Sequence, residues 1–136
     1  MKTIFADTVY WVALFHPQDQ WHNSALKASK ENEECTIVTT DAVLSEVLNL
    51  FSSYGSQWRK IVAREIENLF SLQSIVIIPS NRELFIEGLA LYQSRLDKEY
   101  SHTDCVSMVI MRREKITDVL SSDIHFSQEG FSLLLQ

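Results

Sequence analysis

The side chains best suited to chemistry in this 136-residue chain are four acids from four separate segments: Asp7, Glu46, Asp104 and Asp123. Carboxylates that crowd together repel one another, and at least one takes up a proton unless a positive charge is present. Mg²⁺ or Mn²⁺ is the expected counter-ion, because hard cations prefer oxygen ligands. Such an ion suits phosphodiester hydrolysis, since it can activate water, orient the phosphate and stabilise the developing charge.

Two of these acids stand at the ends of expected strands. Residues 3–7 read as a short strand that ends at Asp7, and residues 118–123 contain another that ends near Asp123. In an open parallel sheet, sites lie beyond the carboxyl ends of the strands. Both side chains are therefore expected at one edge of the sheet.

The other two acids belong to expected helices. Residues 43–51 carry a broad apolar stripe, and Glu46 falls at the edge of that stripe and not opposite it. Residues 103–113 are apolar nearly all round, which predicts a buried helix, and Asp104 opens this helix. The expected topology therefore brings all four carboxylates toward the same edge of the sheet.

The rest of the chain continues an alternation of strands and helices. Residues 41–72 contain two amphipathic segments around Gly55 and are expected to form a helical hairpin. The alternation implies an α/β fold, a sandwich around a mostly parallel sheet, and residues 1–136 are expected to form a single domain. Further helices are expected over residues 9–15, 19–33 and 81–98, and further strands over residues 35–40, 74–79 and 131–135.

The composition, 46% hydrophobic and 22% charged residues, is that of a soluble globular protein. The net charge of −6 weighs weakly against nucleic-acid binding, although carboxylates that hold a cation contribute to that total. Cys35 and Cys105 lie far apart in apolar stretches and are expected to be buried thiols in a reducing cytoplasm. The sequence shows neither a signal-peptide pattern nor an apolar run of about 20 residues, so a cytoplasmic location is expected.

Each acid also has a purely structural interpretation. Asp7 can cap the helix that follows the first strand, and Asp104 fits a capping box that begins at Ser101. Glu46 can be a solvated helix residue, and Asp123 can belong to a simple turn. For any one acid alone the structural interpretation is favoured, because lone motifs have low specificity.

Taken together, the four segments resemble the PIN-domain ribonucleases, and most of all the VapC-type toxins of toxin–antitoxin pairs. The segments that carry the resemblance are ADTVYWVAL, TTDAVLSEVLN, DKEYSHTDCVSMVIMRR and LSSDIHFSQEGFSLL, and they extend over essentially the whole chain. The resemblance implies a three-layer α/β/α sandwich. It also places Asp7, Glu46, Asp104 and Asp123 on the acidic metal-binding positions of the family.

The activity implied by this resemblance is endonucleolytic cleavage of RNA with Mg²⁺ or Mn²⁺. Asp7, Asp104 and Asp123 would ligate the ion. Glu46 would either be a further ligand or orient or deprotonate the attacking water. The implied partners are an RNA substrate, a small VapB-like antitoxin and a second copy of the chain, with the hairpin of residues 41–72 as a pairing surface.

Several residues beside the acids are expected to support the site. Ser121 is expected to hold Asp123 in place, whereas His125 and Phe126 favour a turn anchored by a buried phenylalanine over a metal-binding histidine. The other candidates also have ordinary roles as helix caps or as polar border residues; they are Thr8, Asn49 and Thr103.

Three alternative functions compete with this interpretation. A housekeeping RNA-processing nuclease would use the same acids in a different physiological role. A catalytically inactive PIN domain that serves only as a binding module would be expected to lack one or more of the acids, yet all four are present. A phosphatase with an aspartate nucleophile would need a second Asp two residues after Asp7, where the chain has Val9.

Overall fold

The computed structural model, which describes residues 2–136, is built around a five-stranded sheet. The strand order is β3-β2-β1-β4-β5, and all four neighbouring pairs are parallel. The strands are β1 (Thr3–Ala6), β2 (Thr36–Thr40), β3 (Ile75–Ile78), β4 (Asp118–Leu120) and β5 (Ser132–Leu133). The expected mostly parallel sheet is therefore confirmed.

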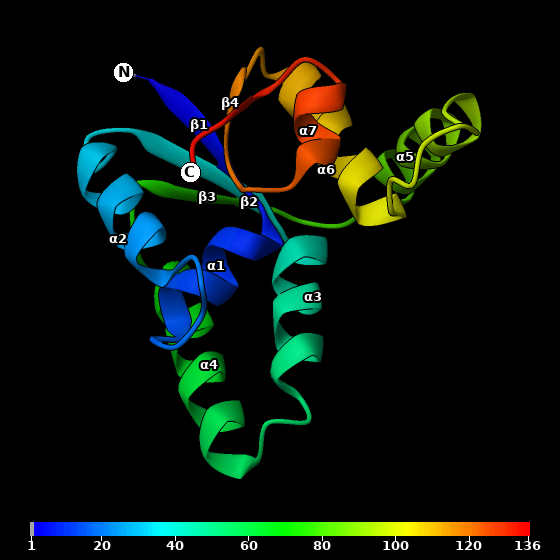
Figure 1. The fold of residues 1–136 in the computed structure, drawn as a ribbon. Coiled ribbons are helices and arrows are strands. Elements are labelled where there is room, and N and C mark those ends of the chain that lie inside the picture. Colours follow the sequence, from blue (N-terminus) through cyan, green and yellow to red (C-terminus); the bar gives the residue numbers. More distant parts are fainter. Residues whose placement is uncertain (1) are drawn as a thin grey trace.

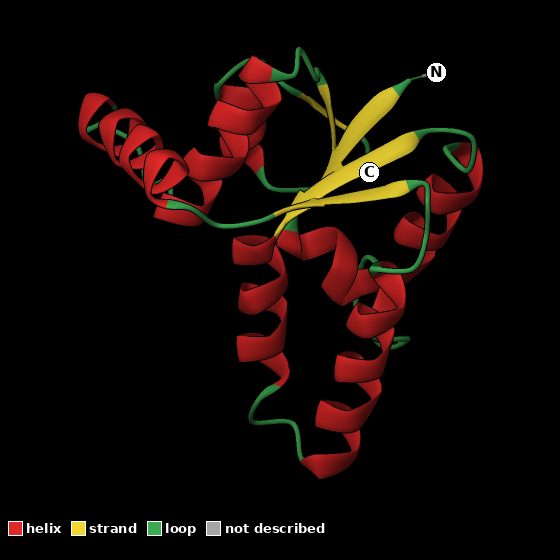
Figure 2. Cartoon of the chain, turned by 180° about the vertical axis from the view of Figure 1, so that it is seen from behind, coloured by secondary structure: helices red, strands yellow, loops and turns green. Residues whose placement is uncertain are grey.

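Helices cover both faces of this sheet, which confirms the expected three-layer sandwich. Figures 1 and 2 show the first four helices on one side and α6 with α7 on the other, while α5 packs on the outside of α6. The helices are α1 (Thr8–Phe15), α2 (His22–Glu31), α3 (Asp41–Phe51), α4 (Ser56–Leu69), α5 (Arg82–Ser94), α6 (His102–Arg113) and α7 (Ile124–Gln128). No helix in residues 2–136 combines the length and the apolar character needed to cross a bilayer.

Three expected helices are shorter in the structure, and one helix was not expected. The segment 19–33 becomes helical only at His22, because Asp19 accepts a hydrogen bond from the backbone N–H of Trp21 in a preceding turn. The segment 57–72 ends at Leu69, and the segment 81–98 ends at Ser94. The expected turn after Asp123 is the short helix α7.

Buried residues at the strand ends fix where the following helices begin. Trp11 of α1 donates its indole N–H to Thr39 Oγ1 at 3.3 Å, and Thr39 donates to the carbonyl oxygen of Ala6 at 2.9 Å. The side chain of Thr40 accepts the backbone N–H of Val43 at 3.0 Å and so caps α3. The ends of β1 and β2 and the starts of α1 and α3 are thereby held together.

On the face of the sheet covered by α6 and α7, the packing depends on a close approach between α5 and α6. Gly88 is buried, and a Cβ at this position would lie 2.6 Å from Val106 Cγ2 and 3.3 Å from the backbone nitrogen of Val106. Such distances leave no room for a methyl group. Gly88 therefore sets the spacing between α5 and the helix whose first turn carries Asp104.

We expect Gly88→Ala to destabilise the protein by up to about 2 kcal/mol. The overpacking against Val106 costs roughly 1–3 kcal/mol, which outweighs the gain in helix propensity of about 1 kcal/mol. Urea unfolding followed by circular dichroism measures the change. Gln93→Ala, an exposed position on the same helix, is the control and should change the stability by less than about 0.5 kcal/mol. An equally stable Gly88→Ala variant would show that the helices separate at little cost.

Candidate metal centre

Asp7 follows β1 directly and is only 3% exposed. It occupies the N-cap position of α1, but within residues 2–136 its side chain makes no capping hydrogen bond. Its backbone N–H instead donates to the carbonyl oxygen of Leu120 at the end of β4, at 3.3 Å. The cap interpretation therefore does not account for this buried carboxylate.

Asp104 and Asp123 combine a capping role with a place in the site. Asp104 is the N3 residue of a capping box on α6, in which its carboxylate accepts the backbone N–H of Ser101 at 3.2 Å. Asp123 is the N-cap of α7, and its carboxylate accepts the backbone N–H of His125 at 3.0 Å. The capping box expected for Asp104 is therefore present, whereas Asp123 caps a short helix in place of the expected simple turn; these bonds hold each carboxylate in a fixed position.

His125 joins these two acids, which the sequence analysis did not predict. Its Nδ1 lies 3.2 Å from Asp104 Oδ2 and 3.3 Å from Asp123 Oδ1. One possible ligand atom from each of the three residues falls within 4.8 Å of the other two. The expected anchor is also present, because Phe126 is fully buried. The segment after β4 therefore anchors the chain through Phe126 and also brings His125 to the two acids.

Ser121 links the two acids that end β1 and β4. It is fully buried, donates its hydroxyl to Asp7 Oδ2 at 3.1 Å, and accepts the backbone N–H of Asp123 at 3.0 Å. Its expected support of Asp123 is thus visible in the structure, with an additional contact to Asp7. One hydroxyl sets the relative position of two carboxylates.

Glu46 is connected to the site by a hydrogen bond with Thr8. The Thr8 hydroxyl donates to Glu46 Oε1, which places the carboxylate of α3 beside the residue that follows Asp7. Thr103 lies half-buried in the first turn of α6 next to Asp104. Asn49 is exposed and lines a hollow of about 420 Å³ between α3 and α4, so the structure favours its border role.

The three aspartates repel one another electrostatically. Burial, followed by the negative charges of Asp104 and then Asp123, raises the pKa of Asp7 to about 7, and hydrogen bonds from Thr8 and Ser121 only partly oppose this rise. Burial also raises the pKa of Asp104, with a further contribution from Asp123. A cation in their midst would relieve both the desolvation and the repulsion.

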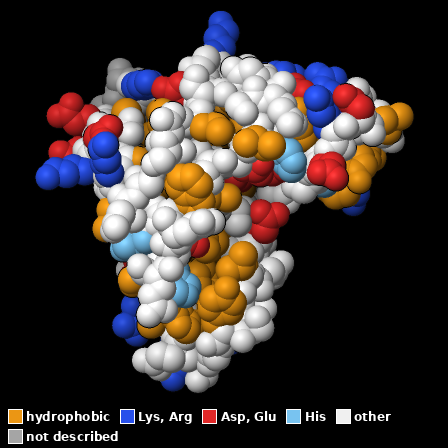
Figure 3. Space-filling view, viewed as in Figure 1, with side chains coloured by type: hydrophobic (Ala, Val, Ile, Leu, Met, Phe, Trp, Pro, Cys, Tyr) orange, Lys and Arg blue, Asp and Glu red, His pale blue; other side chains and the backbone are white. Residues whose placement is uncertain are grey.

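The donor set fits a divalent cation. Carboxylate oxygens of Asp7, Asp104 and Asp123 are the groups that would hold it, with Glu46 and His125 at the border. Figure 3 shows acidic side chains gathered in the middle of one face, between α3 and the α6–α7 pair, with apolar side chains around them. Asp123 is half-buried and can be reached by a ligand from this face, whereas Asp7 and Asp104 lie beneath it.

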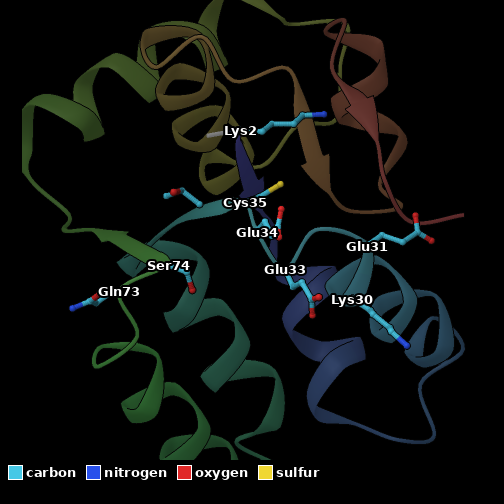
Figure 4. A pocket seen from close by; sticks show the side chains of 9 residues that line it. Lys2, Lys30, Glu31, Glu33, Glu34, Cys35, Gln73 and Ser74 are labelled. Carbon is cyan, nitrogen blue, oxygen red and sulfur yellow. The ribbon is translucent and has the colours of Figure 1, made fainter.

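A second hollow of about 1050 Å³ lies at the opposite end of the sheet, beside the amino ends of β1, β2 and β3. Its lining mixes acids and lysines around Cys35, and Figure 4 shows Lys30 and Gln73 pointing to opposite sides. Nearby, Lys2 pairs with Asp118 at 2.5 Å, so Asp118 lies away from the candidate metal centre. Because the lining side chains do not converge, this hollow is not the candidate site.

The family model described as the PIN domain matches residues 4–131. The chain belongs to the PIN domain family. This finding confirms the resemblance drawn from the four acidic segments. The match extends from β1 to the residue before β5, so every element that carries a site residue lies within the PIN domain.

Among characterised PIN proteins, the chain is similar to the 23S rRNA-specific endonuclease VapC20 of Mycobacterium tuberculosis. The two are 29% identical over 130 residues, which is 94% of this chain and 95% of the relative. The crystal structure of VapC20, described as a Sarcin-Ricin loop cleaving toxin, superposes with a TM-score of 0.84 at 24% identity, covering 98% of this chain and 99% of the other.

More distant structures share the same PIN fold. FitAcB from Neisseria gonorrhoeae matches with a TM-score of 0.68 and 12% identity over 96% of this chain and 95% of that chain. FitAB bound to an IR36 DNA fragment matches with a TM-score of 0.66 and 14% identity over 96% of this chain and 92% of that chain. At these identities the likeness shows the architecture alone.

We expect Asp7→Asn to stabilise the metal-free PIN domain at pH 7.5, by on the order of 1 kcal/mol. The folded-state pKa of Asp7, about 7, lies above the ordinary value of 3.8. The unfolded chain therefore releases this proton first as the pH rises from about 4 to about 7, and the wild type loses stability over this window. Asparagine keeps the shape of the side chain without its charge.

Urea unfolding of both proteins in chelator, at pH 4.5 and pH 7.5, tests this expectation. The difference in unfolding free energy should favour Asp7→Asn at pH 7.5 and shrink at pH 4.5. A difference that does not change with pH would mean that Asp7 is not strained by its buried charge.

Proposed function

We propose that this PIN domain is a metal-dependent endoribonuclease that hydrolyses RNA phosphodiester bonds with Mg²⁺ or Mn²⁺. The observation that carries the proposal is the convergence of Asp104, Asp123 and His125, together with the raised pKa of the neighbouring Asp7. Buried acids that repel one another and share a single histidine are the arrangement expected of a cation site. The similarity to an rRNA endonuclease supports RNA as the substrate.

In this proposal, Asp7, Asp104 and Asp123 hold the cation, which supplies Lewis-acid activation of the phosphate and of water. Ser121 keeps Asp7 and Asp123 at a fixed separation. Glu46 is oriented by the Thr8 hydroxyl on one carboxylate oxygen, and its second oxygen accepts the proton of the attacking water. In this proposal Glu46 is the general base and the aspartates are the ligands.

For the physiological role, we favour a toxin restrained by a small VapB-like antitoxin over a housekeeping RNA-processing nuclease. The relative named as a ribosomal RNA endonuclease and toxin supports this choice and suggests a structured rRNA loop as the first substrate to test. An open reading frame directly upstream that encodes a small DNA-binding protein would favour the toxin role. Isolation of the gene would favour the housekeeping role.

We expect the wild type to cleave 23S rRNA, or an oligonucleotide with its Sarcin-Ricin loop, when Mn²⁺ or Mg²⁺ is present and not in chelator. Asp7→Asn and Asp104→Asn should each lower the cleavage rate by at least about 100-fold, because each removes a charged ligand of the cation. Gel separation of end-labelled RNA measures the rate.

Asp118→Asn is the matched control for this experiment. Its carboxylate pairs with Lys2 at the start of β4, at the other end of the sheet, so this variant should keep the wild-type rate. If folded wild type cuts none of these RNAs, yet binds Mn²⁺ through Asp7, the chain is a nuclease with another target. If it neither cuts nor binds the ion, the inactive binding module is the correct interpretation.

We further propose that a second copy of the chain and the antitoxin cover apolar side chains that are exposed in the isolated chain. These side chains lie on the expected hairpin and on α5; they are Leu48, Leu50, Ile61, Phe85, Ile86, Leu89 and Tyr92. Clustered exposed apolar side chains mark contact surfaces. Size-exclusion chromatography with light scattering should give the mass of a dimer. A monomer at a protein concentration of about 50 µM would contradict a stable pair.

A further inference from the structure

An ion-pair cluster around one largely covered carboxylate lies next to His125 and is not used by the proposed reaction. At its centre is Glu129, whose side chain is 6% exposed and which is the C-cap residue of α7. Arg95 Nε lies 2.6 Å from Glu129 Oε1, and Arg112 Nη2 lies 2.6 Å from Oε2. The Tyr100 hydroxyl donates to Glu129 Oε1 at 3.1 Å. These four residues are called the Glu129 cluster below.

The charges in this cluster are fixed at every pH at which the protein would act. The hydrogen bond from Arg95, aided by bonds from Arg112 and Tyr100, lowers the pKa of Glu129 to about 2 in spite of its burial. Burial, and then the bond to Glu129, raises the pKa of Tyr100 to about 12, so its hydroxyl keeps the proton that it donates. The cluster is therefore a permanent set of charge-assisted bonds.

The cluster joins four segments around the candidate metal centre. Arg95 ends α5, Tyr100 lies in the loop before α6, Arg112 lies in the last turn of α6, and Glu129 ends α7. Arg112 also donates to the backbone carbonyl oxygen of Glu129 at 3.3 Å. The carboxyl end of the five-residue helix α7 is therefore held from two directions.

Tyr100 connects this cluster to the metal centre. Its ring centroid lies 5.4 Å from that of His125, with the planes tilted by 56°. The Nδ1 atom of the same ring lies close to Asp104 and Asp123. The imidazole therefore contacts both the Tyr100 ring and the two carboxylates.

A role in stability alone would explain the contacts of Arg112, which also stands 5.7 Å above the ring of Phe131. A role in stability alone would not require the connection from Glu129 through Tyr100 to His125. That connection touches a side chain whose remaining contacts belong to the metal centre. Residues that orient ligands from behind typically change metal affinity or activity by about 10- to 100-fold when they are removed.

We propose that Glu129, held by Arg95 and Arg112, is a positioning residue that acts through Tyr100 and α7 to keep Asp123 and His125 beside Asp104, ready to bind the cation. This inference rests on the proposed metal site. It adds that the ligand geometry is set from the far end of α7 and not only by the bonds among the ligands themselves.

The test compares Glu129→Gln with Glu87→Gln in the full chain. Both substitutions remove one charge from an ion pair with an arginine of the last turn of α6, but Glu87 pairs with Arg113 on the surface between α5 and α6. Isothermal titration of the metal-stripped proteins with Mn²⁺ gives the dissociation constant. We expect Glu129→Gln to bind Mn²⁺ at least about 10-fold more weakly than wild type, and Glu87→Gln to stay within about 2-fold.

A second variant keeps the inference testable if Glu129→Gln does not fold. Tyr100→Phe removes only the hydroxyl that joins the ring to Glu129, and it should weaken Mn²⁺ binding with little change in the thermal midpoint. In folded Glu129→Gln, the cleavage rate lost at low Mn²⁺ should return at saturating Mn²⁺, whereas the KM for RNA should not change.

The inference is wrong if folded Glu129→Gln, or Tyr100→Phe where the first does not fold, binds Mn²⁺ as the wild type does. It is equally wrong if the affinity falls by the same factor in Glu87→Gln. Direct ion binding separates this result from the proposed function. A wild type that binds Mn²⁺ through Asp7 but cuts no RNA would contradict only the nuclease activity.

Discussion

Repulsion between the carboxylates of Asp7, Asp104 and Asp123 is the constraint on which the rest of the site depends. The parallel sheet brings the acids to one edge, and their burial prevents water from screening their charges. Without a cation, burial and the neighbouring negative charges raise the pKa of Asp7 to about 7, so its ionised form is disfavoured. The fold has to hold these groups close together against a force that separates them.

Hydrogen bonds supply that restraint, and most of them come from ordinary helix capping. The capping box that begins at Ser101 fixes Asp104, the first turn of α7 fixes Asp123, and Ser121 fixes Asp7. Capping is usually read as an alternative to a functional role. Here a carboxylate that caps a helix has lost its rotational freedom, and that loss is what a preorganised ligand needs.

The sequence predicted the framework of the site more completely than its contacts. Strand ends and an apolar helix place Asp7, Asp104 and Asp123, because those features follow from local periodicity. The helix α7 was missed since five residues are too few to show a helical period. The role of His125 was missed as a consequence, because its approach to Asp104 depends on the orientation of α7. That orientation involves Glu129 and Tyr100, which are 29 positions apart.

The pairing of β1 with β4 has a kinetic consequence. Ser121 and Asp7 are 114 positions apart, so the chain must close a very long loop before their hydrogen bond can form. Non-local pairings of this kind form slowly and depend on most of the structure being in place. Partly folded chains would therefore contain every ligand and yet have no assembled centre. The candidate metal centre appears only together with the complete fold.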